Sequence, residues 1–272
     1  MDNKELIKKA AWVRMEVLES VVSGKKGHIG GTYSCVDLLV GLYYGKILRF
    51  NSRNPQWEDR DRFILSKGHA SLALFAIFKD MGIISPELYG TYGKNGGLGA
   101  QVDISLPGIE TNTGSLGHSV GIAAGMALAA KMDSKDYCAY TLIGDAELFE
   151  GSVWEALMFG SQHKLNNLVV IIDRNRLSAT EVIDDDNSVF MNFGKKLELF
   201  GWNYLELDGH NMDNILAVMR VVKSSDKPSI VMANTIKGKG VSFMENKANW
   251  HHGVPTEEQI KIAREELRVQ WK

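Results

Sequence analysis

Two side chains that carry oxygen ligands, Asp145 and Asn175, lie 30 positions apart near the middle of the chain. Each follows an apolar run, at residues 138–143 and 168–172. A carboxylate, an amide oxygen and a nearby backbone carbonyl form a hard oxygen set of the kind that binds Mg²⁺ together with phosphate groups. A helix after Gly144 would also point its free N–H groups at those phosphates. The residue types and their spacing therefore predict a site for a metal-bound diphosphate.

The elements around this pair must bring the two side chains together. Residues 138–143 and 168–172 are apolar enough for buried strands, and residues 150–163 have the spacing of a helix. A strand–helix–strand unit of this length places the residues after both strands at the carboxyl edge of adjacent parallel strands, where open α/β sheets bind ligands. Taken singly, Asp145 could be a helix N-cap and Asn175 a left-handed turn residue. The pair at this spacing favours metal binding.

Helices and strands alternate along the rest of the chain. Apolar residues at helical spacing predict an N-terminal helix that ends near Gly24, followed by a glycine-rich loop at residues 25–32. Further helices are expected at residues 36–44, after His69 to about residue 81, and at 115–130, 212–222 and 257–267; strands are expected at 62–65, 204–207 and 229–233, and a loop-rich segment at 86–108. This alternation indicates a doubly wound, mostly parallel α/β sheet with helices on both faces.

The composition fits one large domain and excludes several classes of partner. The chain has 272 residues, of which 44% are hydrophobic, and only 5 prolines, with no low-complexity linker. We therefore expect a single domain over residues 1–272. The formal charge of -2 gives no electrostatic case for binding nucleic acid or an anionic membrane.

The cysteines and the N-terminal residues predict a compartment. Cys35 and Cys138 lie in apolar contexts without a CxxC spacing, so no disulfide framework is expected. The first residues enter an amphipathic helix directly, without the apolar core of a signal peptide. The longest nearly apolar stretch, residues 120–130, is too short to span a bilayer. We expect a cytoplasmic protein without membrane contact.

Several motifs together resemble one known family. Residues 143–175, IGDAELFEGSVWEALMFGSQHKLNNLVVIIDRN, resemble the thiamine diphosphate motif of the transketolase family, which begins Gly-Asp-Gly and ends in asparagine. The runs KKGHIGG, LSKGHAS, TNTGSLGHSVGIAAGMALA, TIKGKG and HHG occur in the family's order. The resemblance extends from Ala11 to Pro255 and implies the family's thiamine-diphosphate-binding fold, in the half that holds the diphosphate and the metal.

The resemblance implies which residues hold the cofactor. Asp145, Asn175 and the backbone carbonyl of Leu177 would bind Mg²⁺, for which Ca²⁺ or Mn²⁺ would substitute. The residues around thiamine diphosphate would be His69, Gly114, Ser115, Leu116, Gly144, Asp145, Ala146, Glu147, Asn175 and His252. Ala146 replaces the second glycine of the family's Gly-Asp-Gly, and alanine is tolerable there if its φ is negative.

The resemblance also implies a catalytic group at the reactive end of the cofactor. His28, His69 and one of His251 and His252 would line the channel to the thiazolium ring. An imidazole suits this place because it can donate to anionic oxygen and exchange protons near neutral pH. The HG-x-P match favours His252, whereas alignment on Trp250 favours His251.

Four further positions bear on catalysis and substrate. Glu150 matches the glutamate that links two active sites at the family's dimer interface. Gln101 stands where a histidine is common, and it can hydrogen-bond a hydroxyl but cannot shuttle a proton. His118 and Ser178 stand where glutamines are common. These departures leave the identity of the sugar open.

The resemblance implies one component of a split enzyme. Transketolases continue into a pyrimidine-binding domain and a C-terminal domain, which a separate partner subunit would supply in an α2β2 assembly. The expected activity is transfer of a two-carbon ketol unit from a ketose phosphate, or a related ketose derivative, to an aldose, and only with the partner bound. Two alternatives are an α subunit of a 2-oxo-acid dehydrogenase E1, against which GHIGG, SKGHA and TGSLG argue, and a non-catalytic scaffold, which Ala146 and Gln101 motivate.

Overall fold

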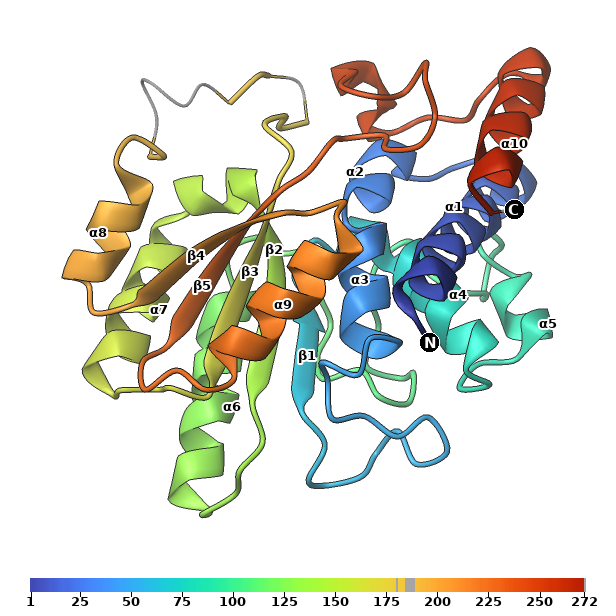
Figure 1. Cartoon of the computed structure of the whole chain (residues 1–272). Helices are drawn as coiled ribbons and strands as arrows, with labels where there is room; N and C mark the ends of the chain where they lie inside the picture. Colours follow the sequence, from blue (N-terminus) through green and yellow to red (C-terminus); the bar gives the residue numbers. More distant parts are fainter. Residues whose placement is uncertain (180, 184–188, 272) are drawn as a thin grey trace.

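The computed structural model describes residues 1–179, 181–183 and 189–271. A five-stranded sheet runs through the middle of this part of the chain (Figure 1). Its strands are β1 (Arg62–Leu65), β2 (Ala139–Gly144), β3 (Leu168–Arg174), β4 (Asn203–Asp208) and β5 (Ser229–Asn234). Their order is β1-β2-β3-β5-β4, and every neighbouring pair is parallel. The predicted parallel sheet is confirmed.

Helices cover both faces of this sheet (Figure 1). One group is α1 (Asn3–Gly24), α3 (Val36–Tyr43), α4 (Ser71–Asp80) and α9 (Met212–Val222), and the other is α6 (Ser119–Met132), α7 (Gly151–Gln162) and α8 (Phe193–Leu199). Val169 and Ile171 of β3 pack with the first group, whereas Val170 and Ile172 pack with the second, because successive side chains of a strand point to opposite faces. The doubly wound arrangement is confirmed.

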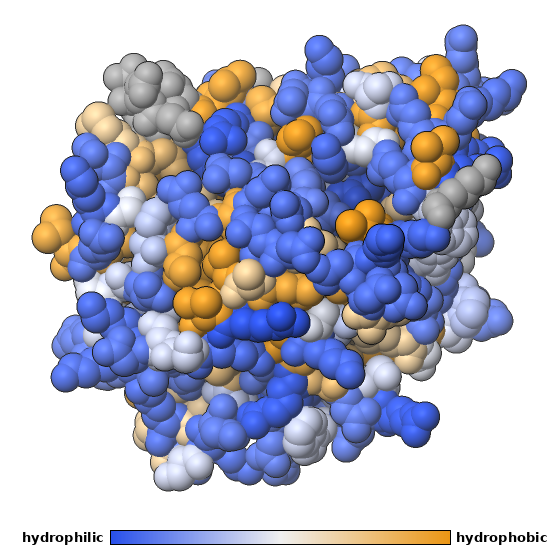
Figure 2. All heavy atoms as spheres, viewed as in Figure 1, coloured by the Kyte–Doolittle hydropathy of each residue, from blue (hydrophilic) through white to orange (hydrophobic). Residues whose placement is uncertain are grey.

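The periphery of the molecule adds one long helix and an exposed apolar patch. α10 (Glu257–Trp271) packs against α1. Figure 2 shows a mostly hydrophilic face with apolar side chains gathered near its middle, over β4 and α9, where Val221 is 54% exposed. Among the described residues, no helix is both long enough and apolar enough to span a bilayer.

The structure departs from the prediction where glycines are dense. The predicted loop at 25–32 contains the start of α2 (Ile29–Ser34), in which a Cβ on Gly30 would lie 2.6 Å from the carbonyl oxygen of Trp250. The helix predicted from residue 115 begins only at Ser119, because Gly114 and Gly117 have φ of 118° and 87°. Two short helices were not predicted, α5 (Pro86–Tyr89) and α8.

Candidate active site

A cavity of about 320 Å³ opens at the carboxyl edge of the sheet. Of the predicted site residues, its wall contains His69, Leu116, Gly144, Asp145, Ala146, Glu147, Glu150, Asn175, Leu177 and His251, together with Ser178. Two more open depressions, of about 590 and 570 Å³, lie elsewhere and contain none of the predicted site residues. Most of the sequence-predicted residues therefore converge on one cavity. The predicted residues that its wall does not contain are His28, Gln101, Gly114, Ser115 and His252.

The predicted metal ligands come from the ends of neighbouring strands. β2 and β3 are paired so that Gly144 lies beside Asp173, which brings Asp145 and Asn175 to the same edge. The Asp145 Oδ2 accepts the N–H of Arg176 at 2.7 Å and Nη1 of Arg174 at 3.2 Å. Burial, and then the charge of Asp173, raise the pKa of Asp145. The hydrogen bonds from Arg176 and Arg174 oppose that rise. The carboxylate is thus held rigidly before any metal binds.

The ordinary roles considered for this pair do not apply. The residue before the 3-10 turn at Asp145–Phe149 is Gly144, so Asp145 is not the N-cap. The left-handed residue in the second loop is Arg176, with φ of 61°, and not Asn175. The Asn175 Oδ1 accepts the N–H of Leu177 at 3.1 Å, which ties the amide to the loop whose carbonyl was the third predicted ligand.

The side chain of Glu147 stabilises the turn at residues 144–147. Glu147 accepts the N–H of Gly144 at 2.9 Å on one oxygen, and the N–H of Gly117 at 2.9 Å and the hydroxyl of Ser66 on the other. Burial raises the pKa of Glu147, although these bonds favour the ionised form. Ala146 is not among the residues with positive φ, so the alanine that departs from Gly-Asp-Gly fits without strain.

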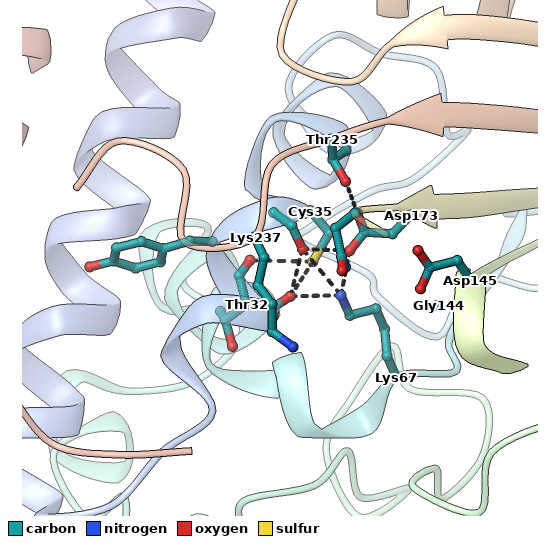
Figure 3. Close-up of polar contacts among 12 residues, drawn as sticks. Thr32, Cys35, Lys67, Gly144, Asp145, Asp173, Thr235 and Lys237 are labelled. Atoms are coloured by element: carbon teal, nitrogen blue, oxygen red, sulfur yellow. Dashed lines mark hydrogen bonds and ion pairs between the residues drawn. The ribbon is translucent and has the colours of Figure 1, made fainter. Parts of the chain in front are cut away.

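A buried ion pair, missed in the sequence, lies under the cavity (Figure 3). The Lys67 ammonium pairs with Asp173 and donates to the carbonyl of Gly31 at 2.6 Å. Asp173 also accepts from Ser34 at 2.6 Å and from Thr235. Burial would raise the pKa of Asp173, but the charge of Lys67 and the hydrogen bonds from Lys67, Ser34 and Thr235 together outweigh it and lower that pKa. The pair joins α2 to the ends of β1, β3 and β5.

A second lysine, also missed, enters the cavity itself. The Lys237 Nζ donates to the carbonyl of Ser178 at 2.8 Å and to that of Leu177 at 3.4 Å, and lies 3.3 Å from Nδ1 of His251. Burial, and then the charge of Lys67, lower the pKa of Lys237 to about 8. Its ammonium remains charged at neutral pH and is suited to an anionic group. The signal for both lysines was their place in the LSKGHAS and TIKGKG runs.

The four predicted histidines form one cluster. The ring centroid of His28 lies 5.2 Å from that of His69, 5.4 Å from that of His251 and 4.8 Å from that of His252. Burial, and then Lys67, lower the pKa of His69 to about 2; burial, and then Lys237, lower that of His251 to about 4. Both rings are neutral at physiological pH. His251 lies on the cavity wall, whereas His252 contacts His28 from outside that wall.

The remaining predicted residues lie at the rim. Gln101 is exposed, and its amide oxygen would lie 2.8 Å from a Cβ on Gly114. Ser115 and Leu116 are exposed beside it, as are His118 and Glu150. The side chain of Glu150 packs on Gly117, where a Cβ would lie 2.7 Å from the Cβ of Glu150. Of these residues, Leu116 and Glu150 belong to the cavity wall, whereas Gln101, Ser115 and His118 do not.

The donor set fits a metal diphosphate. Among the described residues, no group of three or more histidine, cysteine, aspartate or glutamate side chains could hold a metal by itself. The site offers one carboxylate, one amide oxygen and one carbonyl, and Mg²⁺ requires six oxygens, so the rest must come from water and the ligand. The Lys237 ammonium stands beside these oxygens for the remaining phosphate charge. Such a site is suited to a metal that arrives with its diphosphate.

Comparisons with known proteins agree with this geometry. The family model described as "Transketolase, thiamine diphosphate binding domain" matches residues 6–272. The chain is 44% identical over 256 residues to one of the subunits of apulose-4-phosphate transketolase from Phocaeicola vulgatus, and the match covers 93% of this chain and 90% of that one. It is 38% identical over 258 residues to 6-deoxy-6-sulfo-D-fructose transketolase subunit SqwG of a Clostridium species, covering 94% and 93%.

A solved structure shows the same fold. The transketolase of Campylobacter jejuni superposes with a TM-score of 0.92 at 31% identity, over 98% of this chain. The chain spans only 43% of the length of that protein. The family match, the fold and the geometry of the site all indicate the same family. The chain belongs to the transketolase family and contains its thiamine-diphosphate-binding domain.

Proposed function

We propose that the chain is the cofactor-binding subunit of a thiamine-diphosphate- and Mg²⁺-dependent transketolase. It would transfer a two-carbon ketol unit from a ketose phosphate, or a related ketose derivative, to an aldose. One observation carries the proposal: Asp145, Asn175 and the Leu177 carbonyl share a cavity with Lys237 at the carboxyl edge of the sheet. The two relatives are named for a phosphorylated and a sulfonated sugar, which supports a donor with a terminal anionic group.

Each residue has a stated task in this proposal. Asp145, Asn175 and the Leu177 carbonyl would hold Mg²⁺, and the ammonium of Lys237 would neutralise the diphosphate. His69, kept neutral, would donate one hydrogen bond to an anionic oxygen. When bound, thiamine diphosphate supplies the nucleophilic carbon for breaking and forming carbon–carbon bonds.

His28 is the candidate for proton transfer at a substrate hydroxyl. Its Nδ1 is buried and has no hydrogen-bond partner among the described residues. Burial, and then the neighbouring His252, lower the pKa of His28, so the ring is a neutral acceptor at physiological pH. A buried ring nitrogen without a partner is costly unless a ligand satisfies it. We assign the His28 ring to a hydroxyl of the sugar.

The proposal includes a partner that closes the cavity. Leu116 and Phe149 are large apolar side chains exposed near its mouth. A second polypeptide with the pyrimidine-binding domain would cover them and supply the other half of the cofactor site. Both relatives are named as transketolase subunits, which supports a second chain.

A second copy of this chain would complete an α2β2 assembly. α7 exposes Met158 and Phe159, and the neighbouring α6 exposes Gly121 and Gly125, which leave room for close packing. Large apolar surface of this kind is uncommon on monomers. Glu150, at the start of α7, would then stand where two copies meet and link their active sites.

The deciding experiment is to co-purify the chain with a candidate partner that carries a pyrimidine-binding domain. The complex is assayed with a panel of ketose phosphates and with a sulfonated ketose, with Mg²⁺, Ca²⁺ or Mn²⁺ added. We expect ketol transfer by the complex and none by the isolated chain. Decarboxylation of a 2-oxo acid would favour the dehydrogenase alternative, and cofactor binding without any turnover would favour the scaffold. Transfer by the isolated chain would contradict the need for a partner.

A further inference from the structure

The loop after β5, at residues 235–240, carries the Lys237 ammonium into the cavity. Hydrogen bonds fix the loop at Thr235, Ile236 and Gly238, and the Lys237 carbonyl itself accepts the N–H of Asn246 at 2.9 Å. The bonds at Thr235 and Gly238 run to the floor of the cavity and to α2. The N–H of Ile236 instead bonds to a residue outside the cavity wall. This bond reaches a side chain to which the proposed function assigns no task.

That side chain is His210, in the turn between β4 and α9. The N–H of Ile236 donates to Nε2 of His210 at 2.8 Å. A backbone N–H can only donate, so Nε2 carries no proton and Nδ1 carries it. Nδ1 then donates to Oδ2 of Asp37 at 2.7 Å. One bond to α3 and one to the loop therefore fix both the tautomer and the plane of the ring.

Asp37 is held in turn by α1. The guanidinium of Arg14 pairs with both carboxylate oxygens, and it donates to the carbonyl of Tyr33 at 3.1 Å. Burial alone would raise the pKa of Asp37, but Arg14 and His210 outweigh it and lower that pKa to about 2. The carboxylate is thus a permanent acceptor for His210. A continuous set of contacts runs from α1 to the loop.

The turn that carries His210 is fitted closely to the loop. The N–H of Gly209 donates to the carbonyl of Asn234 at 2.8 Å. A Cβ on Gly209 would clash with the side chain of Thr235 and would lie 3.0 Å from the Asn234 carbonyl oxygen. The turn therefore cannot move away from the end of β5 without losing contacts. It forms a rigid support for the imidazole.

We propose that His210 is a positioning residue that holds Lys237 at the diphosphate site and thereby sets the affinity for thiamine diphosphate. The role rests on the proposed function, in which Lys237 neutralises the diphosphate. The bond at Ile236 fixes the N–H of the residue immediately before Lys237, so its loss loosens the loop on that side of the ammonium, while the bond from Asn246 to the Lys237 carbonyl remains. His210 does not line the cavity, so it acts only through the loop.

The test uses the complex of this chain with its partner subunit. His210→Leu removes both ring nitrogens, whereas His210→Gln keeps one donor and one acceptor, the nitrogen and the oxygen of its carboxamide. Asp61→Ala is the matched control, because Asp61 is also buried and accepts the N–H groups of Arg49 and Cys138, but at the opposite edge of the sheet. Binding of thiamine diphosphate with Mg²⁺ is measured by calorimetry, and unfolding by denaturant on the same samples.

We expect His210→Leu to weaken thiamine diphosphate binding about fivefold to tenfold, the effect of losing one positioning hydrogen bond. His210→Gln should restore it, and Asp61→Ala should lower stability without changing affinity. If the leucine variant does not fold, His210→Phe, which keeps a ring without its nitrogens, takes its place.

Three results would overturn the role of His210. They are unchanged affinity in the leucine or phenylalanine variant, a loss that glutamine does not rescue, and an equal loss in Asp61→Ala. A wild-type complex that binds no thiamine diphosphate would instead overturn the proposed function itself. The two failures are therefore distinguishable.

Discussion

The Asp145 carboxylate already accepts hydrogen bonds from the protein before it can bind a metal. Its Oδ2 already accepts from Arg174 and from the backbone of Arg176, and its Oδ1 accepts the N–H of Ala146 at 2.9 Å. A carboxylate has about four lone-pair sites, and these three bonds leave one of them, on Oδ1, for a cation. The bonds therefore orient the carboxylate and still allow it to bind a metal. Asparagine would keep the size of the side chain but lose one acceptor and the charge that attracts Mg²⁺.

Asp145→Asn should weaken Mg²⁺-dependent thiamine diphosphate binding by at least about tenfold, because an amide is a much poorer Mg²⁺ ligand than a carboxylate. Calorimetry of the assembled complex measures the affinity, and circular dichroism checks the fold. Asp133→Asn, at the exposed end of α6, is the control and should bind normally. Unchanged affinity in Asp145→Asn would show that the metal site lies elsewhere.

Gln101 is placed to affect the substrate and not the cofactor. Its side chain packs on Gly68 and Gly114 at the exposed rim of the cavity. An amide there offers one hydrogen bond, typically about 0.5–1.5 kcal/mol net, but it exchanges no proton at neutral pH. Gln101→His should therefore change kcat or donor preference in a panel of ketose donors. A tenfold change in cofactor affinity, with donor preference unchanged, would contradict this placement.

The sequence predicted those site residues whose pattern lies within one short stretch of the chain. Asp145 and Asn175 each follow an apolar run, and the distance between them fits one strand–helix–strand unit. Lys67 lies in the LSKGHAS run, but its pairing with Asp173 had no local signal, because the two residues are 106 positions apart and the pairing depends on the order of the strands. Lys237 likewise reaches the cavity only through a loop whose path no local pattern specifies.

At the scale of elements, the sequence predicted the helices whose apolar residues recur at regular helical spacing. It did not predict the glycine-rich helix α2, which packs closely against neighbouring backbone. α9 has the predicted limits, whereas α2 fell in a predicted loop. The glycines of α2 lower helix propensity, yet close approach of Trp250 leaves no room for larger residues at Gly30. Tertiary packing therefore decides this helix. The contact between α1 and α3 allows a test of such packing through its buried charge.

Asp37 should make the stability of the fold depend on pH in acid. Its pKa is lowered from 3.8 to about 2, so the ionised form stabilises the folded state above pH 3.8, and this contribution is lost as pH falls through about 2. The shift corresponds to about 2 kcal/mol. Denaturant unfolding of the wild type and of Asp37→Asn should show a stability difference that narrows by about this amount from pH 5 to pH 2. A constant difference would contradict the assignment.

At the scale of the whole molecule, the layers followed from the alternation of strands and helices, but the strand order did not. β5 lies between β3 and β4, so the last strand in the chain is an interior strand of the sheet and not an edge strand. This insertion brings the loop with Lys237 to the predicted metal ligands. The surface that remains exposed on α6 and α7, on the far side of the sheet from α9, is the place where assembly can be tested.

Met158→Asp should weaken the association of two copies of this chain. Met158 is 51% exposed on α7, so a charge there leaves the monomer folded but becomes costly when an apolar partner surface covers it. Val221→Asp on α9 is the matched control, because Val221 is 54% exposed on the opposite helix layer. Light scattering of the complex with the partner subunit should show a smaller mass for Met158→Asp and an unchanged mass for Val221→Asp. Equal masses for the two variants would mean that α7 does not lie between copies, and Glu150 could not then link two active sites.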